Sequence, residues 1–391
     1  MVHVYELIGM RKNKKKIMLV FGTRPEAIKM APLVHALKAE SDQFDVQVCV
    51  TAQHRQMLDQ VLRIFEITPD LDLNLMKPDQ DLFDVTASVL HGMKYVFRPI
   101  KPDAVLVHGD TTTTLATAIA GFYAGVPVGH VEAGLRTHDL YAPFPEEFNR
   151  QVVSKVTRWH FAPTELSRNN LIAERVSHQR ITVTGNTVID ALHWILKRIK
   201  DESKLLIRVK EQLHSMLPFD YIANRFVLIT GHRRENFGDR FLQICQALRE
   251  LASRFTTTHF VYPVHLNPNV QQPVCEILAE LANVHLIKPL DYEPFVYLLN
   301  HCYLVLTDSG GIQEEAPSLG KPVLVMRDVT ERPEAIEAGT VELVGAKQSR
   351  IIKGVSRLLD DDRHYQCMSR ARNPYGDGQA CARIVEILRT I

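Results

Sequence analysis

The sequence predicts an α/β fold made of two doubly wound domains, and three observations lead to this prediction. Short β-rich runs alternate with amphipathic helical segments, and the runs are almost continuously apolar, which is typical of parallel strands covered on both faces. The same order of elements begins again after about residue 224. A chain of 391 residues also corresponds to two or three domains of about 150 residues, each able to bury its own core.

The first half contains six candidate strands, separated by segments with helical periodicity. The strands are expected at residues 17–22, 45–51, 103–110, 127–134, 159–164 and 181–186. The helices are expected at residues 27–39, 55–65, 82–97 and 112–124. The second half repeats the pattern with candidate strands at residues 226–232, 258–265, 284–289, 302–308, 322–327 and 340–345. Between the halves, residues 188–224 are helical and charged, and Pro218 marks a linker there.

The charge balance excludes several function classes. Lys and Arg number 46 against 45 Asp and Glu, so no overall positive field would attract nucleic acid or an anionic membrane. Six cysteines lack metal-ligand and redox spacing, which predicts buried, reduced thiols and no metal site. In residues 1–16 the basic residues follow the apolar ones, the reverse of a signal peptide. We therefore expect a cytoplasmic protein with no nucleic-acid or membrane partner.

Ligands of doubly wound sheets bind beyond the carboxyl ends of the strands, and these positions are polar here. The first strand is followed by Arg24, and the next helix carries Lys29. Arg24 could bind a phosphate or lie in solvent. The third strand ends at Asp110, before four threonines, and this carboxylate could be catalytic or cap the next helix.

Further carboxylates follow the fourth strand. Glu132 comes directly after an apolar run, where an unpaired charge would be costly, so it is either a site residue or the ion-pair partner of Arg136 or another arginine. Glu146 and Glu147 fall in the first turn of a predicted helix, where acidic residues are favoured in any case.

The second half offers features suited to an anion. His232 ends its first strand and precedes two arginines, whose guanidinium groups can bind phosphate oxygens, although a solvated basic turn is the alternative. Residues 309–311 form a Ser-Gly-Gly turn between a strand and a helix, where free backbone amides favour a diphosphate, although a simple tight turn is the alternative. Neither the dinucleotide-binding glycine pattern nor the P-loop pattern occurs.

Nine ordered motifs resemble one family. They are FGTRPEAIKMAPL (21–33), VHGDTTTTLA (107–116), GHVEAGLRT (129–137), PEEFNR (145–150), GNTVIDAL (185–192), TGHRREN (230–236), PVHLNPNV (263–270), the long segment 307–335 and NPYGDGQA (373–380). This pattern is similar to that of the non-hydrolysing UDP-N-acetylglucosamine 2-epimerases of bacteria, from about residue 17 to the end of the chain.

The resemblance implies a GT-B-like α/β fold, with two Rossmann-like domains that face a central cleft. It divides the chain into an N-terminal extension (1–16), a first domain (17–190), a UDP-binding second domain (191–376) and a C-terminal helix (377–391) that packs back on the first domain. It also implies a homodimer that interconverts UDP-GlcNAc and UDP-ManNAc without a cofactor, and so supplies activated ManNAc for cell-envelope polysaccharide.

The resemblance also assigns roles to individual residues. The catalytic group would be Asp110, Glu132, Glu146 and His232. The substrate-binding group would be Arg24, Lys29, Phe295, Ser309, Gly310, Gly311, Glu315 and Arg332. Within that group, Glu315 would contact the ribose and Phe295 the uracil, although the helical context also permits a core phenylalanine. Gln53 and Gln56 match a regulatory substrate site of some relatives, but Asp79 stands where those relatives have an arginine.

The route implied by the resemblance is elimination of UDP to 2-acetamidoglucal, followed by re-addition with the proton delivered to the opposite face of the sugar. This route requires an acid–base group on each face, and donors for the charge that develops on the diphosphate. The alternatives are a hydrolysing epimerase that releases ManNAc, a glycosyltransferase of the same fold, and a UDP-sugar sensor without catalysis. A glycosyltransferase would need an acceptor site, and the sequence shows no membrane-facing segment that would provide one. A sensor would bind UDP-sugar without needing the three carboxylates.

Overall fold

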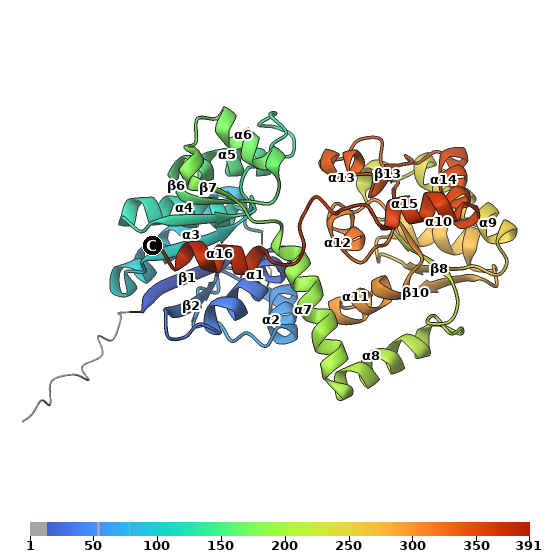
Figure 1. Ribbon diagram of the computed structural model, residues 1–391, viewed down its shortest axis with the longest axis horizontal. Helices are drawn as coiled ribbons and strands as arrows, with labels where there is room; N and C mark the ends of the chain where they lie inside the picture. Colours follow the sequence, from blue (N-terminus) through green and yellow to red (C-terminus); the bar gives the residue numbers. More distant parts are fainter. Residues whose placement is uncertain (1–13, 53–54, 78) are drawn as a thin grey trace, which may run out of the picture. The chain divides into compact units, whose positions relative to one another are not determined.

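The structure, a computed structural model, describes residues 14–52, 55–77 and 79–391. The chain divides into two compact units (Figure 1). Unit 1 comprises the residues up to Thr187 together with Gln379–Ile391, and unit 2 comprises Val188–Gly378.

Unit 1 is built on a seven-stranded parallel sheet with the strand order β3-β2-β1-β4-β5-β6-β7. The strands are β1 (Lys15–Phe21), β2 (Phe44–Val50), β3 (Leu71–Asp72), β4 (Ala104–His108), β5 (Val128–Val131), β6 (Thr157–Ala162) and β7 (Ile181–Val183). The order reverses between β1 and β4, which is the point where doubly wound sheets bind ligands.

Helices cover both faces of this sheet (Figure 1). They are α1 (Arg24–Lys38), α2 (Arg55–Ile64), α3 (Leu82–Ile100), α4 (Thr112–Ala124), α5 (Glu146–Val156), α6 (Glu165–Ala173) and α16 (Ala380–Leu388). The interior strand β1 is fully buried from Met18 to Phe21, as expected for a strand packed on both faces. The C-terminal helix α16 lies beside α1, where Arg389 forms a bidentate ion pair with Glu40 at 2.6 and 2.9 Å.

Unit 2 contains a six-stranded parallel sheet with the order β10-β9-β8-β11-β12-β13. The strands are β8 (Phe226–Thr230), β9 (His259–Pro263), β10 (Val284–Ile287), β11 (Leu304–Thr307), β12 (Val323–Val325) and β13 (Val341–Leu343). Its helices are α7 (Thr187–Asp201), α8 (Ser203–Met216), α9 (Asp239–Arg254), α10 (Pro268–Leu278), α11 (Tyr292–His301), α12 (Ile312–Ser318), α13 (Pro333–Glu337), α14 (Gln348–Asp360) and α15 (Asp362–Ser369). The strand order reverses between β8 and β11.

The structure confirms the two-domain α/β fold and contains all twelve predicted strands. The expectation of six strands in each half is wrong for unit 1, because the two-residue strand β3 adds a seventh. The expectation of buried cysteines is wrong for Cys275 and Cys367, which lie on solvent-facing positions of α10 and α15. The predicted linker region forms α7 and α8, and Pro218 follows the end of α8.

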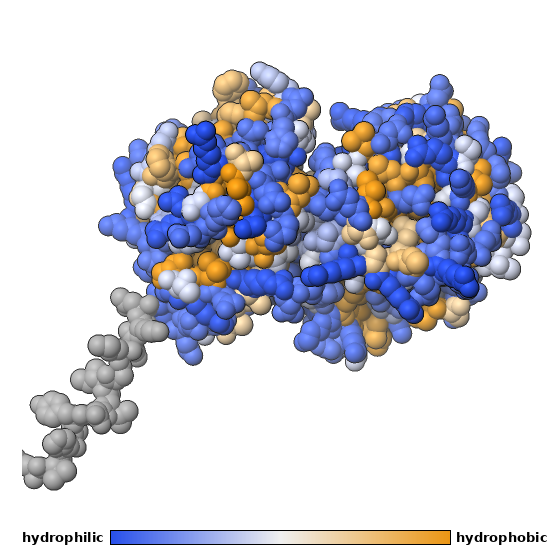
Figure 2. Space-filling view, turned by 45° about the horizontal axis from the view of Figure 1, so that its top comes forward, coloured by the Kyte–Doolittle hydropathy of each residue, from blue (hydrophilic) through white to orange (hydrophobic). Residues whose placement is uncertain are grey.

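The surface that Figure 2 shows is mixed, with hydrophilic side chains interrupting the apolar ones over both units. Within the described part of the chain, none of the helices combines the length and the apolar content that a membrane span requires.

Candidate active site

The predicted site residues of unit 1 gather at the carboxyl ends of β1, β4 and β5. The loop after β1 is held by Glu26, a buried carboxylate that accepts hydrogen bonds from the backbone amides of Gly22 and Thr23 at 3.0 and 2.8 Å. Glu26 also accepts hydrogen bonds from the hydroxyls of Thr111 and Thr114, at 2.6 and 3.2 Å. Burial raises the pKa of Glu26, while these hydrogen bonds oppose the shift. The turn at Gly22 and Thr23, which leads into α1 at Arg24, is therefore tied to the start of α4.

Asp110 follows β4 and does not cap the next helix. The N-cap of α4 is Thr111, whose hydroxyl accepts a hydrogen bond from the Thr114 amide at 3.1 Å. The interpretation of Asp110 as a helix cap is therefore wrong. The preceding Gly109 has φ of +67°, a conformation that glycine adopts without strain, and this turn directs the chain from the strand into α4.

The environment of Asp110 perturbs its titration. Burial raises its pKa to about 6, and the repulsion of Glu132 and Glu146 acts in the same direction, while Arg150 and Lys29 oppose it. A carboxyl group with this pKa exchanges its proton close to neutral pH, which suits general acid–base catalysis.

Glu132 follows β5 and lies in the left-handed backbone region, with φ of +63°. This conformation is costly for a residue with a side chain, and such strain clusters at functional sites. Its carboxylate forms an ion pair with Lys29 and accepts a hydrogen bond from Asn186 Nδ2 at 2.8 Å. The Nε2 atom of the buried His108 lies 3.7 Å from Glu132 Oε2, and burial lowers the pKa of His108 to about 3, which keeps this imidazole neutral.

The ion pair considered between Glu132 and Arg136 is absent, because Arg136 has another partner. Its guanidinium binds Glu174 in bidentate fashion, at 2.6 and 3.0 Å. The charge on Glu132 is instead balanced by Lys29 of α1, and both residues belong to the predicted site.

The two adjacent glutamates of α5 have different surroundings. Glu147 is fully buried and accepts hydrogen bonds from the amides of Thr137 and His138, at 3.0 and 3.2 Å, so it organises the loop before the helix. Glu146 is half-buried, and its charge acts on Asp110. Of the two, Glu146 is therefore the one available to the site.

In unit 2 the carboxyl ends of β8 and β11 are organised by Asp308, which is 0% exposed. Its carboxylate accepts hydrogen bonds from the amides of His232 and Arg233, at 3.0 and 2.9 Å, and from Asn236 Nδ2 at 3.3 Å. The His232 ring, which is 41% exposed, stacks on His265 with centroids 5.3 Å apart. Partial burial lowers the pKa of His232, although the Asp308 carboxylate opposes this shift.

The Ser-Gly-Gly turn lies next to Asp308 and leads into α12. The amides of Gln313 and Glu314 donate back to the carbonyls of Gly310 and Gly311, at 3.2 and 3.0 Å, and the amides ahead of them have no acceptor within the helix. Arg332 donates to Glu314 at 2.8 Å, and its guanidinium would lie 3.5 Å from a Cβ placed on Gly310. A guanidinium and backbone amides thus occur at one turn, which suits an anion.

The residues assigned to the nucleoside also lie together in unit 2. Tyr292, in the first turn of α11, donates its hydroxyl to Glu315 Oε1 at 3.2 Å. Phe295 is half-buried and lies three residues further along α11, on the same side of the helix as Tyr292. The aromatic and carboxylate groups expected for uracil and ribose are therefore neighbours.

Not every predicted site residue can be placed, and sequence reasoning missed some residues. Gln53 lies outside the described residues, and Gln56 is exposed on α2. Asn186 and Asp308 were not predicted as site residues, although both follow strands and ligands are expected at strand ends. Arg150 was missed because it lies inside a helix, where no strand end points to it.

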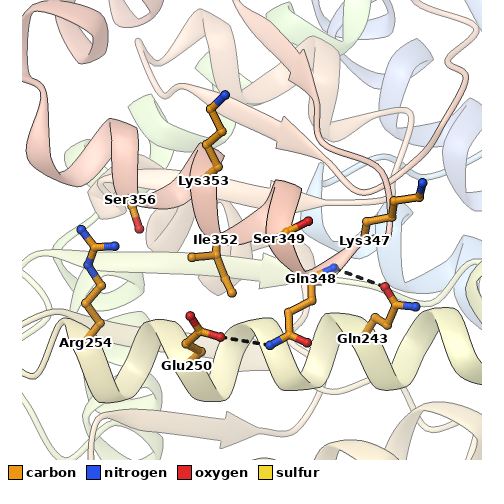
Figure 3. A pocket seen from close by; sticks show the side chains of 9 residues that line it. All are labelled: Gln243, Glu250, Arg254, Lys347, Gln348, Ser349, Ile352, Lys353 and Ser356. Atoms are coloured by element: carbon orange, nitrogen blue, oxygen red, sulfur yellow. Dashed lines mark hydrogen bonds between the residues drawn. The ribbon is translucent and has the colours of Figure 1, made fainter.

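A separate groove in unit 2, of about 720 Å³, runs between α9 and α14 (Figure 3). Gln348 crosses it and donates its backbone amide to Gln243 Oε1 at 3.4 Å and its side-chain amide to Glu250 at 3.0 Å. None of the predicted site residues is among those that line this groove.

Comparisons with known proteins agree with this arrangement. Residues 35–389 match the family model described as UDP-N-acetylglucosamine 2-epimerase. A protein of that name from Escherichia coli K12 is 59% identical over 374 residues, covering 96% of this chain and 98% of that protein.

Solved structures extend the comparison. UDP-GlcNAc 2-epimerase from Neisseria meningitidis bound to UDP-GlcNAc has a TM-score of 0.86 at 51% identity, covering 96% of this chain and 100% of that one. The Methanocaldococcus jannaschii enzyme in complex with UDP-GlcNAc and UDP has a TM-score of 0.77 at 32% identity, with the same coverage of 96% and 100%. The chain therefore belongs to the UDP-N-acetylglucosamine 2-epimerase family, and its two α/β domains have the GT-B-like fold of these relatives.

Proposed function

We propose that this protein interconverts UDP-GlcNAc and UDP-ManNAc by eliminating UDP and adding it back, without hydrolysis and without a cofactor. The observation that carries the proposal is the group of three carboxylates, Asp110, Glu132 and Glu146, whose charges interact at the carboxyl edge of one sheet. Two relatives whose structures contain UDP-GlcNAc support the substrate. Binding of UDP alone would not require the carboxylates.

Unit 2 would bind the nucleotide. Its basic and amide-rich turn around Ser309, Gly311 and Arg332 suits a diphosphate, and the leaving group needs donors of this kind where its charge develops. Phe295 would stack on uracil, and Glu315 would accept a hydrogen bond from the ribose. His232 would also contact the phosphates, and the role of Arg24 stays a prediction from the family resemblance.

Unit 1 would carry out the proton transfers. The proton on C2 leaves as the bond from C1 to the diphosphate oxygen breaks, so that a C1–C2 double bond forms and UDP departs. Re-addition reverses these changes, with a proton delivered to the other face of C2. Asp110, whose pKa is raised to about 6, could accept or donate this proton near neutral pH, and Glu132 with its Lys29 ion pair provides a second acid–base group in a different environment.

Turnover in D₂O tests this route. We expect deuterium at C2 of the product, formed from UDP-GlcNAc with no nicotinamide added. Asp110→Asn, Glu132→Gln and Glu146→Gln should each slow epimerisation, at least one of them by about 10²-fold or more, and at least one should release 2-acetamidoglucal and UDP. Glu165→Gln, an exposed position on α6, is the control and should retain activity.

The competing functions give different results in the same experiment. Full retention of hydrogen at C2 by the wild type, with no glucal from any variant, would refute the elimination route. Release of free ManNAc without UDP-ManNAc would indicate a hydrolysing epimerase. Binding of UDP-GlcNAc without turnover would indicate a sensor. If UDP-ManNAc is the product, the protein would supply activated ManNAc for polysaccharide synthesis in the cytoplasm.

We also propose that the protein is a homodimer that pairs through α3 and α4. Tyr95 on α3 is 67% exposed and Tyr123 on α4 is 75% exposed, and a groove of about 720 Å³ lies between these packed helices. The charges on α3 are asymmetric, with Asp84 in the first turn and Arg98 in the last. A two-fold axis would place the acidic end of one copy's α3 against the basic end of the other's.

A further inference from the structure

We propose that Arg150 is a positioning residue for Asp110, holding the carboxylate in place and setting its charge through an ion pair that Glu147 shares. This inference rests on the proposed function, because it concerns one of the carboxylates assigned to proton transfer. Arg150 lies on α5, while Asp110 follows β4.

The geometry places a single guanidinium between two carboxylates. Arg150 Nη2 lies 3.4 Å from Asp110 Oδ2, and its Nε lies 3.3 Å from Glu147 Oε2. The Nε atom also donates to the Glu146 carbonyl at 3.3 Å, which keeps the guanidinium close to the helix. The neighbouring Asn149 donates its side chain to the Asp110 carbonyl at 2.8 Å. Two successive residues of α5 thus hold the backbone and the carboxylate of Asp110.

Burial of the guanidinium makes this contact stronger than a surface ion pair, although the Asp110 side chain is itself 31% exposed. The Arg150 side chain is 3% exposed and Glu147 is 0% exposed, so water screens their charges weakly. The buried Nη1 atom of Arg150 has no hydrogen-bond partner among the described residues. Burying an unpaired donor costs free energy, so packing alone does not account for an arginine at this position. Glu147 is itself fixed by the amides of the preceding loop.

The charges around Asp110 come from three parts of unit 1. Arg150 and Glu146 lie on α5, Glu132 follows β5, and Lys29 lies on α1. Among the charged neighbours, Arg150 has the largest effect, and it opposes the rise in the pKa of Asp110 that burial causes. Removing the positive charge of Arg150 should therefore raise that pKa further. Removing the negative charge of Glu147 should lower it, because Arg150 would then act on Asp110 alone.

Two substitutions with opposite expected signs test the proposal. The titration of Asp110 is followed by ¹³C NMR of protein labelled at the aspartate carboxyl carbons, with Asp110→Asn used to assign the signal. We expect Arg150→Gln to raise the titration midpoint by about 1 to 3 pH units and Glu147→Gln to lower it. Arg150→Lys keeps the charge and should restore the midpoint toward the wild-type value. The limb of the kcat/KM profile that reports Asp110 should move in the same directions.

Arg136→Gln is the matched control, because Arg136 is also a buried arginine in an ion pair, but with Glu174. It should lower the melting temperature and leave the Asp110 midpoint unchanged. An unchanged midpoint in Arg150→Gln, or shifts of the same sign in Arg150→Gln and Glu147→Gln, would overturn the proposal. If Arg150→Gln fails to fold, the downward shift in Glu147→Gln decides. The NMR titration needs no turnover, so a wild type that does not epimerise UDP-GlcNAc would refute the proposed function while this coupling is still measured.

Discussion

Buried histidines should make unit 1 sensitive to mild acid. His130 on β5 and His160 on β6 are both 1% exposed and lie opposite each other in the sheet register. Burial lowers the pKa of His130 to about 4 and that of His160 to about 3, from an ordinary value of 6.5. Below pH 6.5 the unfolded chain therefore binds protons that the folded chain does not. The stability linked to each imidazole is fully present above this pH and is lost as the pH falls toward the folded-state value.

The size of the effect follows from the pKa values. Each pH unit below 6.5 costs about 1.4 kcal/mol per histidine, so a change from pH 7.5 to pH 5.5 costs about 1.4 kcal/mol for His160. Glutamine is neutral at both pH values, so His160→Gln should lose about 1.4 kcal/mol less than the wild type over this interval. Urea unfolding measures the difference through the fluorescence of the adjacent Trp159, in a Trp194→Phe background.

Substitution of His178, which is exposed in the same unit, provides the control. His178→Gln should show the same loss of stability on acidification as the wild type. If His160→Gln also shows that full loss, the buried imidazole is not the titrating group, and the argument from burial fails.

Three further predictions concern binding, assembly and the loop after β1. Phe295→Ala should weaken UDP binding in calorimetry, through loss of stacking worth about 1 kcal/mol beyond burial, and unchanged affinity in a folded variant would remove Phe295 from the uracil site. Tyr95→Ser combined with Tyr123→Ser should convert a dimer to a monomer in sedimentation velocity, whereas a monomeric wild type would contradict the assembly proposed. Glu26→Gln replaces an acceptor of two backbone amides with a partial donor and should cost about 1 to 3 kcal/mol in urea unfolding; unaltered stability would show that these hydrogen bonds contribute little.

The fold could be predicted because parallel strands buried on both faces leave a local signature. Residues 17–21 and 226–229 are apolar without interruption, and each run lies in an interior strand of its sheet. The two residues of β3 carry no periodicity, so no pattern could have indicated them. The exposed Cys275 lies on a helix face whose orientation depends on which elements pack against it, and a single sequence does not specify this.

The sequence indicated where the candidate site lies better than it indicated which residues interact there. The rule that ligands bind at strand ends located Asp110, Glu132 and His232. It could not decide whether Asp110 caps a helix or serves the candidate site, because Thr111 is an equally good cap and only the backbone geometry distinguishes the two. The partners of Glu132 are far away in the sequence, and Lys29 is 103 residues distant, so local reasoning considered the nearby Arg136 instead.

In both units a buried carboxylate holds the loop that follows an interior strand, and this explains how acidic residues can lie within sites proposed for an anionic substrate. In unit 1 the buried Glu26 accepts the backbone amides that follow β1, and in unit 2 the buried Asp308 accepts those that follow β8. A carboxylate that accepts two amides, and further donors from neighbouring side chains, has its charge spread over those donors. The loop is fixed by its backbone, so the side chains of Arg24 and His232 are not needed to hold it. Each loop can therefore present a side chain that donates hydrogen bonds beyond the end of its strand, where a phosphate group would meet it.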